Sequence, residues 1–180
     1  NPTLSVMRLR AVGKELAREL ERLEQWANGG AAIRAEATGR VRPTTNGGTK
    51  VTYKLTKNDL RRLRKGVAIF GEILLAGGAE EVSLGPHGWQ QVTSMEEIER
   101  FKEEGPTSVT SYEMILSHMF GTCKMGSDPA TNVVDNGFQH HDVDQLFVAD
   151  SSVFPSNIGV NSQISIIAMA KQCARSILLP

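Results

Sequence analysis

The chain has 180 residues, of which 40% are hydrophobic, and its 20 lysines and arginines balance 20 aspartates and glutamates. This length is enough for one domain with its own core, or for part of a larger protein. The balanced charge gives no reason to expect nucleic acid or an anionic membrane as a partner, and no apolar run is long enough to cross a bilayer.

The cysteines and the start of the chain bear on where the protein works. Cys123 and Cys173 are far apart and form neither a disulfide framework nor a zinc-binding pattern, so we expect a reducing compartment. These residues contain no recognisable secretory signal, and we expect a cytoplasmic location. Because the first residue is Asn1 and not methionine, we expect a processed or excised piece of a longer protein.

The first predicted element is an amphipathic helix from Leu4 to Trp26. Charged residues between Arg8 and Glu24 cover one side, and Asn28-Gly29-Gly30 is a typical helix end. The apolar stripe comprises Leu4, Met7, Val12, Leu16, Leu20 and Leu23. We interpret this segment as a packing helix.

A β-hairpin is predicted next. Residues 40–42 lead to Pro43, residues 44–48 contain Asn46-Gly47, and residues 50–55 alternate in the manner of a strand. Asn-Gly between two β-prone runs is a strong hairpin signal.

A second helix is predicted from Asp59 to about Ala76, with Thr56 or Asn58 as its cap. The basic residues 61–65 lie on the polar side of this helix and include no aromatic residue. This pattern favours a solvated face over a nucleic-acid patch.

Smaller elements lead to a boundary in the middle of the chain. Residues 81–84 indicate a short strand, and Ser94 followed by Glu97 is a capping-box pattern that begins a helix through Lys102. Residues 105–108 read Gly-Pro-Thr-Ser and mark the boundary. We therefore predict a first portion over residues 1–108 and a second over residues 109–180.

The last third of the chain contains the residues that indicate chemistry. Residues 146–149 form an apolar run that predicts a buried strand ending at Asp150. Asn161 occupies the predicted N-cap of a final helix, whose free N–H groups and positive dipole suit a phosphate or the pyrimidine edge of a reduced flavin. From the residues alone, Asn161 is a cap or a site residue, and His118 is a core histidine or a catalytic one. The apolar stripe of the helix comprises Ile166, Ile167, Ala170, Cys173, Ala174, Ile177 and Leu178.

One segment suggests a competing metal site. His140, His141, Asp142 and Asp144 place four ligand types in five residues. Adjacent residues on a strand point in opposite directions, and no distant Cys/His pair completes a tetrahedral set. We therefore interpret the segment as a polar turn and predict no metal.

Several motifs of the last third together resemble the C-terminal signature of the glucose–methanol–choline (GMC) flavoprotein oxidoreductases. They are H-x-x-G-T-C-K-M-G from His118, V-V-D from Val133, L-F-V-A-D-S-S-V-F-P from Leu146 and G-V-N-S-Q from Gly159. Residues 39–79 resemble the substrate domain of that family more loosely. The family's G-x-G-x-x-G dinucleotide fingerprint is missing from this chain.

The resemblance implies a role for each site residue. His118 matches the position of the base that takes the hydroxyl proton of an alcohol, or hydrogen-bonds the nascent alkoxide, while hydride passes to the flavin. Asn161 matches the second active-site position and would orient the substrate oxygen. Backbone groups of Asp150 and Ser151 would lie near the ribityl and pyrophosphate region of FAD, and those of Ser162 and Gln163 would face its pyrimidine. Relatives often have proline in place of Ser162.

These observations predict an α+β fold with a mixed sheet and packing helices, in which a C-terminal strand and helix return to the FAD domain. The function implied by the resemblance is FAD-dependent oxidation of a primary or secondary alcohol. The partners would be a small alcohol and the N-terminal FAD-binding part of the same protein. We expect the chain alone to retain no FAD, to be inactive and to self-associate through its apolar helix face. The alternatives are a non-catalytic α+β binding or assembly module that lacks the flavin-binding half, and a metal-binding protein that uses His140 and His141.

Overall fold

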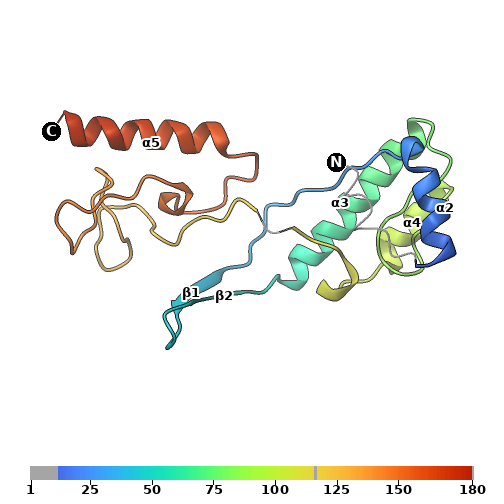
Figure 1. The fold of residues 1–180 in the computed structure, drawn as a ribbon, viewed down its shortest axis with the longest axis horizontal. Coiled ribbons are helices and arrows are strands. Elements are labelled where there is room, and N and C mark those ends of the chain that lie inside the picture. The colour runs from blue at the N-terminus through green and yellow to red at the C-terminus, as the bar shows by residue number, and fades with distance from the viewer. Residues whose placement is uncertain (1–11, 116, 180) are drawn as a thin grey trace. The chain divides into compact units, whose positions relative to one another are not determined.

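A computed structural model describes residues 12–115 and 117–179 (Figure 1). The chain divides into two compact units, which are described separately. The first unit comprises the described residues of Asn1–Ala32 together with Leu60–Glu113. The second comprises Ile33–Asp59 and Met114–Pro180 as far as they are described. The β-hairpin therefore belongs to the same unit as the C-terminal segments, whereas the predicted portions at 1–108 and 109–180 follow chain order.

The core of the first unit lies between helices α3 (Lys57–Ala76) and α4 (Met95–Glu104). Ile98 and Phe101 on α4 are fully buried, and the ring of Trp89 meets that of Phe101 edge-on at 5.1 Å. Gly71 allows this packing, because a Cβ there would lie 2.7 Å from Leu84 Cδ2. Both predicted helices are confirmed, although α3 starts at Lys57.

Specific contacts fix both ends of α4. Ser94 is its N-cap and accepts a hydrogen bond from the Glu97 backbone N–H at 3.2 Å, as the capping-box pattern predicts. At the other end, Arg64 Nη1 on α3 donates to the carbonyl oxygens of Glu103 and Gly105, at 3.0 and 2.8 Å. A cation at a helix C-terminus also complements the helix dipole. At least Arg64 of the basic run 61–65 thus has a structural role.

The N-terminal helix differs from its prediction. The helix α2 covers only Lys14–Glu21, and the 3₁₀ turn η1 covers Leu23–Gln25. The prediction is wrong at residues 12 and 13, because Gly13 has φ +62°, a left-handed conformation that cannot belong to a right-handed helix. The predicted residues 4–11 lie outside the described residues. The predicted strand at residues 81–84 is reduced to one bridge between Val82 and Val92.

In the second unit, strands β1 (Gly39–Pro43) and β2 (Thr49–Tyr53) form the predicted hairpin. They pair antiparallel with Val41 opposite Val51, and Gly47 takes φ +78° in the turn. The side chain of Asp59 anchors the base of this hairpin. It is fully buried and accepts from the backbone N–H groups of Glu36 at 2.8 Å, Thr56 at 3.0 Å and Ala37 at 3.2 Å.

Thr56 and Asp59 also form a reciprocal cap at the start of α3. The Asp59 backbone N–H donates to Thr56 Oγ1 at 3.0 Å, while the Asp59 carboxylate accepts from the Thr56 N–H. Of the two predicted capping residues, Thr56 is therefore the one that caps. Burial by itself would raise the pKa of Asp59, but the hydrogen bonds from Glu36, Thr56 and Ala37 outweigh it and hold that pKa below its usual value.

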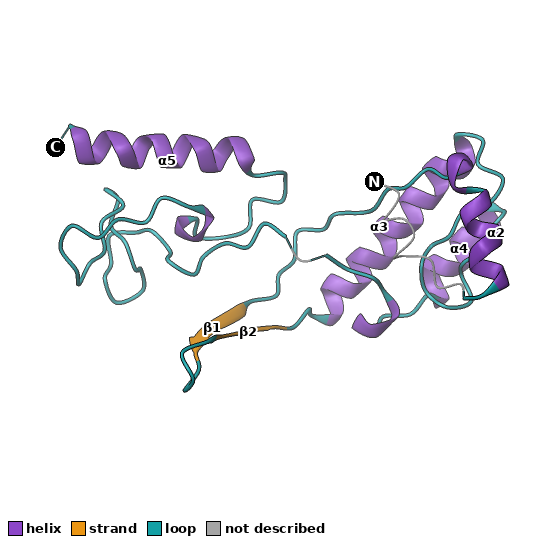
Figure 2. Cartoon of the chain, in the orientation of Figure 1, coloured by secondary structure: helices purple, strands orange, loops and turns teal. Residues whose placement is uncertain are grey.

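Most of the C-terminal part of this unit is irregular chain (Figure 2). Single β-bridges join Met125 to Val134, Val134 to His140 and Gln139 to Phe147. The prediction of a buried strand at residues 146–149 is wrong: only Phe147 makes a bridge, and Leu146 is exposed. The physical reason is that pairing is limited to one antiparallel bridge: the Val148 N–H donates to the Phe138 carbonyl, the Leu146 carbonyl accepts from the His140 N–H, and no ladder of the described residues continues beyond them.

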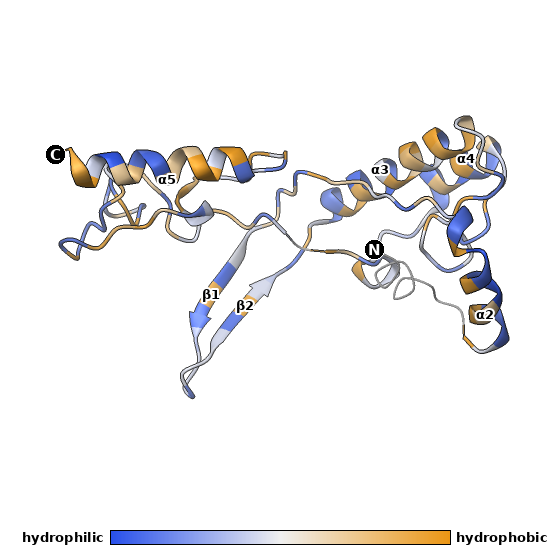
Figure 3. Cartoon of the chain, turned by 45° about the horizontal axis from the view of Figure 1, so that its top comes forward, coloured by the Kyte–Doolittle hydropathy of each residue, from blue (hydrophilic) through white to orange (hydrophobic). Residues whose placement is uncertain are grey.

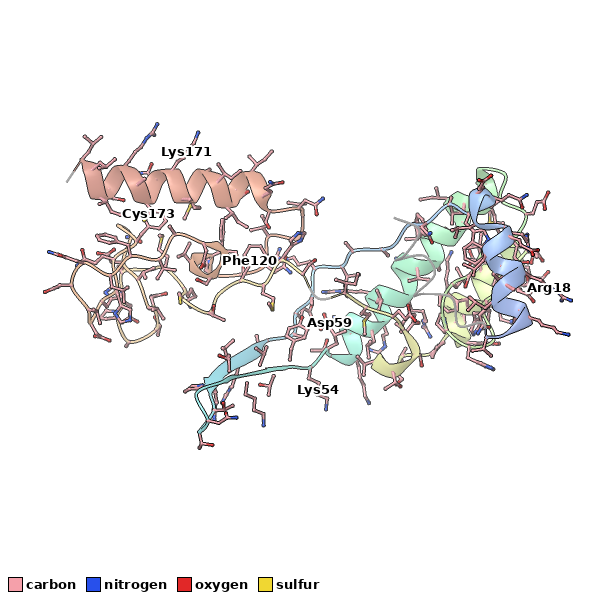
Figure 4. The ribbon with its side chains drawn as sticks, viewed as in Figure 1. Arg18, Lys54, Asp59, Phe120, Lys171 and Cys173 are labelled. Carbon is pink, nitrogen blue, oxygen red and sulfur yellow. The ribbon has the colours of Figure 1, made fainter. Side chains whose placement is uncertain are left out.

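The helix α5 (Gln163–Leu178) covers the small apolar core of these loops. The fully buried members of this core are Val134, Phe138, Val153 and Cys173. Cys173 lies on the side of α5 that faces the loops, and Lys171 lies on the opposite side (Figure 4). Burial raises the pKa of the Cys173 thiol, as expected for a packed cysteine. Hydrophobic positions also occur away from the core, at both ends of α5 (Figure 3).

The α+β class is confirmed. Within residues 12–115 and 117–179, the sheet consists of the antiparallel β1–β2 pair alone.

Candidate functional site

His118 lies on an exposed loop of the second unit in an unusual backbone conformation. Its φ is +55°, in the left-handed region that few residues other than glycine occupy. Histidine is among the side chains that tolerate this region better than most. Backbone strain of this kind occurs preferentially at functional sites. Phe138 at φ +73° and Gln145 at φ +61° share this region, so the conformation draws attention to His118 only together with the motif.

The loop of His118 is attached to the segment that follows Asp150. The rings of Phe120 and Phe154 meet edge-on at 5.5 Å. The Cys123 backbone N–H donates to the Ser152 carbonyl at 3.1 Å, and the Met125 N–H donates to the Val153 carbonyl at 2.9 Å. Two motifs that are distant in the sequence are thus held side by side by backbone hydrogen bonds.

Asp150 and Ser151 occupy the start of the 3₁₀ turn η3 (Ser151–Val153). The carboxylate of Asp150 accepts from the Ser152 backbone N–H at 2.7 Å and from the Ser152 hydroxyl at 2.5 Å. The side chain of Asp150 is therefore used to shape the turn, and its carbonyl accepts from the Val153 N–H at 3.4 Å, so the backbone N–H is the group left for a ligand.

Asn161, Ser162 and Gln163 form the approach to α5. The prediction that Asn161 caps this helix is wrong, because the N-cap is Ser162. The first hydrogen bond of the helix runs from the Ile166 N–H to the Ser162 carbonyl at 2.9 Å, which places the helix start one residue later. Asn161 is exposed, and its side chain has no hydrogen-bond partner within the described part of the chain.

Ser162 has an unsatisfied hydroxyl. Its side chain makes no capping hydrogen bond. Ser162 is only 1% exposed, and its Oγ has no hydrogen-bond partner among residues 12–115 and 117–179. A buried polar atom without a partner costs about 1–3 kcal/mol, so such atoms are usually explained by a bound water, ion or ligand, or by a catalytic role. Together with the free N–H groups of the first turn of α5, this hydroxyl makes the helix start a donor-rich place.

The structure brings these residues together to different degrees. The loop of His118 and the turn at Asp150 and Ser151 are in direct backbone contact. The start of α5 is connected less directly, through Cys173 and Met169, which pack on the same core as Val153 and Phe154. Between residues 117 and 179, no hydrogen bond joins His118 to Asn161.

The histidines of the competing metal hypothesis contact backbone groups. His141 Nε2 is 2.9 Å from the Gly126 carbonyl oxygen, and His140 Nδ1 accepts from the Asp142 N–H at 3.0 Å. No group of three or more potential ligands is close enough to hold a metal in the part of the chain that the structure describes.

Sequence reasoning missed the Phe120–Phe154 pair, although each ring lies inside a quoted motif. The signal that could have found it is the presence of phenylalanine in both motifs, although the second motif also contains Phe147. The orphan hydroxyl of Ser162 was also missed, because its lack of partners is a property of the folded chain.

The chain is similar to several known proteins, which share its motifs or its fold. The family model described as GMC oxidoreductase, which represents the C-terminal region, matches residues 35–170. An uncharacterized GMC-type oxidoreductase of Mycobacterium tuberculosis is 33% identical over 170 residues, which cover 94% of this chain and 26% of that protein. A long-chain-alcohol oxidase of Arabidopsis thaliana is 34% identical over 149 residues, covering 78% of this chain and 20% of that protein.

A solved structure supports the same fold. The crystal structure of pyridoxine 4-oxidase from Mesorbium loti matches with a TM-score of 0.52 and 24% identity, covering 79% of this chain and 28% of that one. The chain belongs to the GMC oxidoreductase family and represents its C-terminal region. GMC oxidoreductases are generally FAD-dependent. The chain spans about a quarter of the length of the curated relatives that it matches. No helix of the described residues is long and apolar enough to cross a membrane.

Proposed function

We propose that the protein containing this chain is an FAD-dependent oxidoreductase that oxidises a primary or secondary alcohol, and that this chain supplies its proton-handling group. The observation that carries the proposal is His118, an exposed imidazole in a left-handed backbone conformation on a loop fixed to the Asp150 turn. Family membership and the long-chain-alcohol oxidase relatives support the reaction class.

His118 would act on the substrate hydroxyl. Its imidazole can accept the hydroxyl proton, and a positioned base of this kind contributes about 10²–10⁴-fold to the rate. The chain that follows His118 is attached by the Phe120–Phe154 contact and by the backbone hydrogen bonds of Cys123 and Met125, which would limit the movement of the His118 loop. This positioning matters because proton transfer requires hydrogen-bond distance to the substrate.

Asn161 would orient the substrate oxygen. Its amide offers two N–H donors and one acceptor but has no proton to exchange at neutral pH. Because Asn161 is exposed and is not the helix cap, this amide remains free for a ligand. Orientation of this kind lowers the barrier by restricting the substrate to reactive geometries.

The donors at the start of α5 fit an electron-rich cofactor. Ser162 and Gln163 would hold one polar edge of FAD through the N–H groups of the first helical turn, and Asp150 and Ser151 would hold another part through backbone groups. The unpartnered Ser162 hydroxyl favours this assignment, since a polar ligand group nearby would relieve its cost. FAD, when bound, supplies the acceptor for the hydride of the alcohol carbon.

One observation favours the alternative of a non-catalytic binding module. Ile167, Ile177 and Leu178 on α5 are large apolar residues with exposed side chains, as on a surface that packs against another body. The same exposure fits packing against an FAD-binding part of the same protein.

The experiment uses the protein expressed from its complete coding region. Its absorbance spectrum is recorded and then followed anaerobically after a primary or secondary alcohol is added. We expect a flavin spectrum that bleaches as the alcohol is oxidised. Residues 1–180 purified alone, as the control, are expected to be colourless and inactive. A protein without flavin, or with flavin that no alcohol reduces, would contradict the proposal and favour the binding module.

A further inference from the structure

Two stretches that carry the candidate site residues contain no formal charge. Residues 114–123, around His118, and residues 151–170, around Asn161, include no aspartate, glutamate, lysine or arginine. Charged residues make up 22% of the whole chain, so their absence from both stretches distinguishes this part of the protein from the rest.

The same stretches expose large apolar side chains. Near His118, Ile115 is 72% exposed and Met119 is 60% exposed. Near Asn161, Val160 is 67% exposed and Ile164 is 83% exposed. These side chains lie within three residues of His118 or Asn161 along the chain, so whatever molecule meets the candidate polar groups also meets apolar surface.

Glu113, Lys124, Asp150 and Lys171 border the two stretches in the sequence, and Asp150 and Arg34 make contacts of their own. Asp150 is bonded to Ser152, as described above. Arg34 turns its aliphatic carbons toward Gly159, where a Cβ would lie 3.2 Å from Arg34 Cδ. A charged or many-hydroxyl substrate would therefore find few partners here, and its desolvation would be uncompensated.

From this juxtaposition we infer that the alcohol substrate has an uncharged, apolar body, and that Met119 and Val160 contact that body. The inference rests on the proposed function. In this inference, His118 and Asn161 hold the hydroxyl group of the alcohol. The apolar body of the alcohol contributes to binding because its surface is removed from water. Methionine suits this task, because its flexible thioether side chain adapts to different alkyl shapes.

The test measures kcat/KM of the complete protein for the linear primary alcohols from ethanol to octan-1-ol. Each methylene that leaves water is expected to raise kcat/KM by up to about fourfold, until the apolar surface is filled. Omega-hydroxyoctanoate, in which a carboxylate replaces the terminal methyl group of octan-1-ol, should be at least ~10-fold poorer than octan-1-ol.

Two near-isosteric variants with matched controls test the assigned residues. Met119→Gln and Val160→Thr keep the side-chain size but make it polar. Each should lower the ratio of kcat/KM for octan-1-ol to that for ethanol, by about tenfold for Met119→Gln. Met95→Gln and Val109→Thr make the same changes at exposed positions of the first unit and should leave the ratio at the parent value.

The outcomes separate this inference from the proposed function. A protein that oxidises alcohols with no dependence on chain length, or that prefers omega-hydroxyoctanoate, overturns the inference and leaves the proposed function standing. Unaltered ratios in both site variants also overturn it and indicate that the rest of the protein covers these side chains. Failure to oxidise any alcohol overturns the proposed function itself.

Discussion

The two compact units of this chain are stabilised in different ways. In the first unit, α3 packs against α4, whose Ile98 and Phe101 are fully buried. Gly71 permits close packing at Leu84, and the Arg64 guanidinium caps the C-terminal end of α4. In the second unit, apart from the hairpin, irregular loops are joined by single bridges and covered by one helix. The left-handed histidine and the orphan hydroxyl both occur in the second unit.

This difference indicates where the chain accepts a cost in stability. A non-glycine residue with positive φ and an unpaired buried hydroxyl each lower the free energy of unfolding. Natural proteins tolerate such features mainly where function needs them. In the proposed function, the second unit carries the groups that would meet substrate and cofactor.

The largest effect on stability is expected from Phe101→Ala in the first unit. Phe101 is fully buried and contacts Trp89, so its removal leaves a cavity and should lower the free energy of unfolding by about 3–5 kcal/mol. Chemical denaturation measures this loss. Phe101→Leu is the control and should cost much less. If alanine costs no more than leucine, Phe101 is not a centre of this core.

Asn161→Asp should affect activity and spare stability. An ionised aspartate offers no N–H to the substrate, and its charge opposes the transfer of hydride to the cofactor. We expect flavin reduction by alcohol in the complete protein to fall by ~10²-fold. The melting temperature should hardly change, because Asn161 is exposed and does not cap α5.

Asn136→Asp introduces the same charge at an exposed turn of the same unit and is the matched control. In Asn136→Asp, alcohol should reduce the flavin at the parent rate. If Asn161→Asp also reacts at the parent rate, Asn161 has no part in the site.

Asp59→Asn should destabilise the base of the hairpin by about 2 kcal/mol at neutral pH, because an amide N–H₂ cannot accept the hydrogen bonds of the carboxylate. The pKa of Asp59 is lowered in the folded state, so its contribution is present above the unfolded pKa of about 3.9 and is lost as the pH falls through the folded pKa. The difference between parent and variant should therefore shrink in acid. Asp144→Asn, at an exposed position, should show no such difference. A gap that is constant from neutral to acidic pH would contradict this role.

The smallest effect is expected from Ser94→Ala, which removes the cap of α4 and should cost about 1 kcal/mol. Ser94→Asp restores a capping oxygen and should recover most of the loss. Equal stability of the two variants would mean that the cap does not contribute.

Local signals account for the parts of the fold that the sequence predicted correctly. Ser94, Thr56 and the Asn46-Gly47 turn act on residues a few positions away, so their patterns are readable in the chain. The loops of the second unit depend on hydrogen bonds between distant residues, such as Cys123 with Ser152. The hydrophobic periodicity of the sequence does not indicate such long-range hydrogen bonds. The apolar run 146–149 therefore looked like a strand although it pairs with residues 138–140 through a single bridge.

The candidate site was predictable only through its motifs. The resemblance to GMC oxidoreductases is confirmed, whereas the roles of His118, Asn161, Asp150, Ser151, Ser162 and Gln163 stay predictions. Residue patterns placed the cap of α5 at Asn161, but asparagine and serine are about equally good capping residues, so the sequence does not distinguish Asn161 from Ser162. The structure places the cap at Ser162, which makes no side-chain capping hydrogen bond and is buried.

The central claim is that His118 handles the substrate proton, and its most direct test is rapid-mixing reduction of the flavin in the complete protein. With His118→Ala, the rate of flavin reduction by alcohol should fall by ~10²–10⁴-fold while the flavin content stays close to that of the parent. His87→Ala, which removes an exposed histidine of the first unit, should react at the parent rate. Reduction of the His118→Ala flavin at the parent rate would contradict the account.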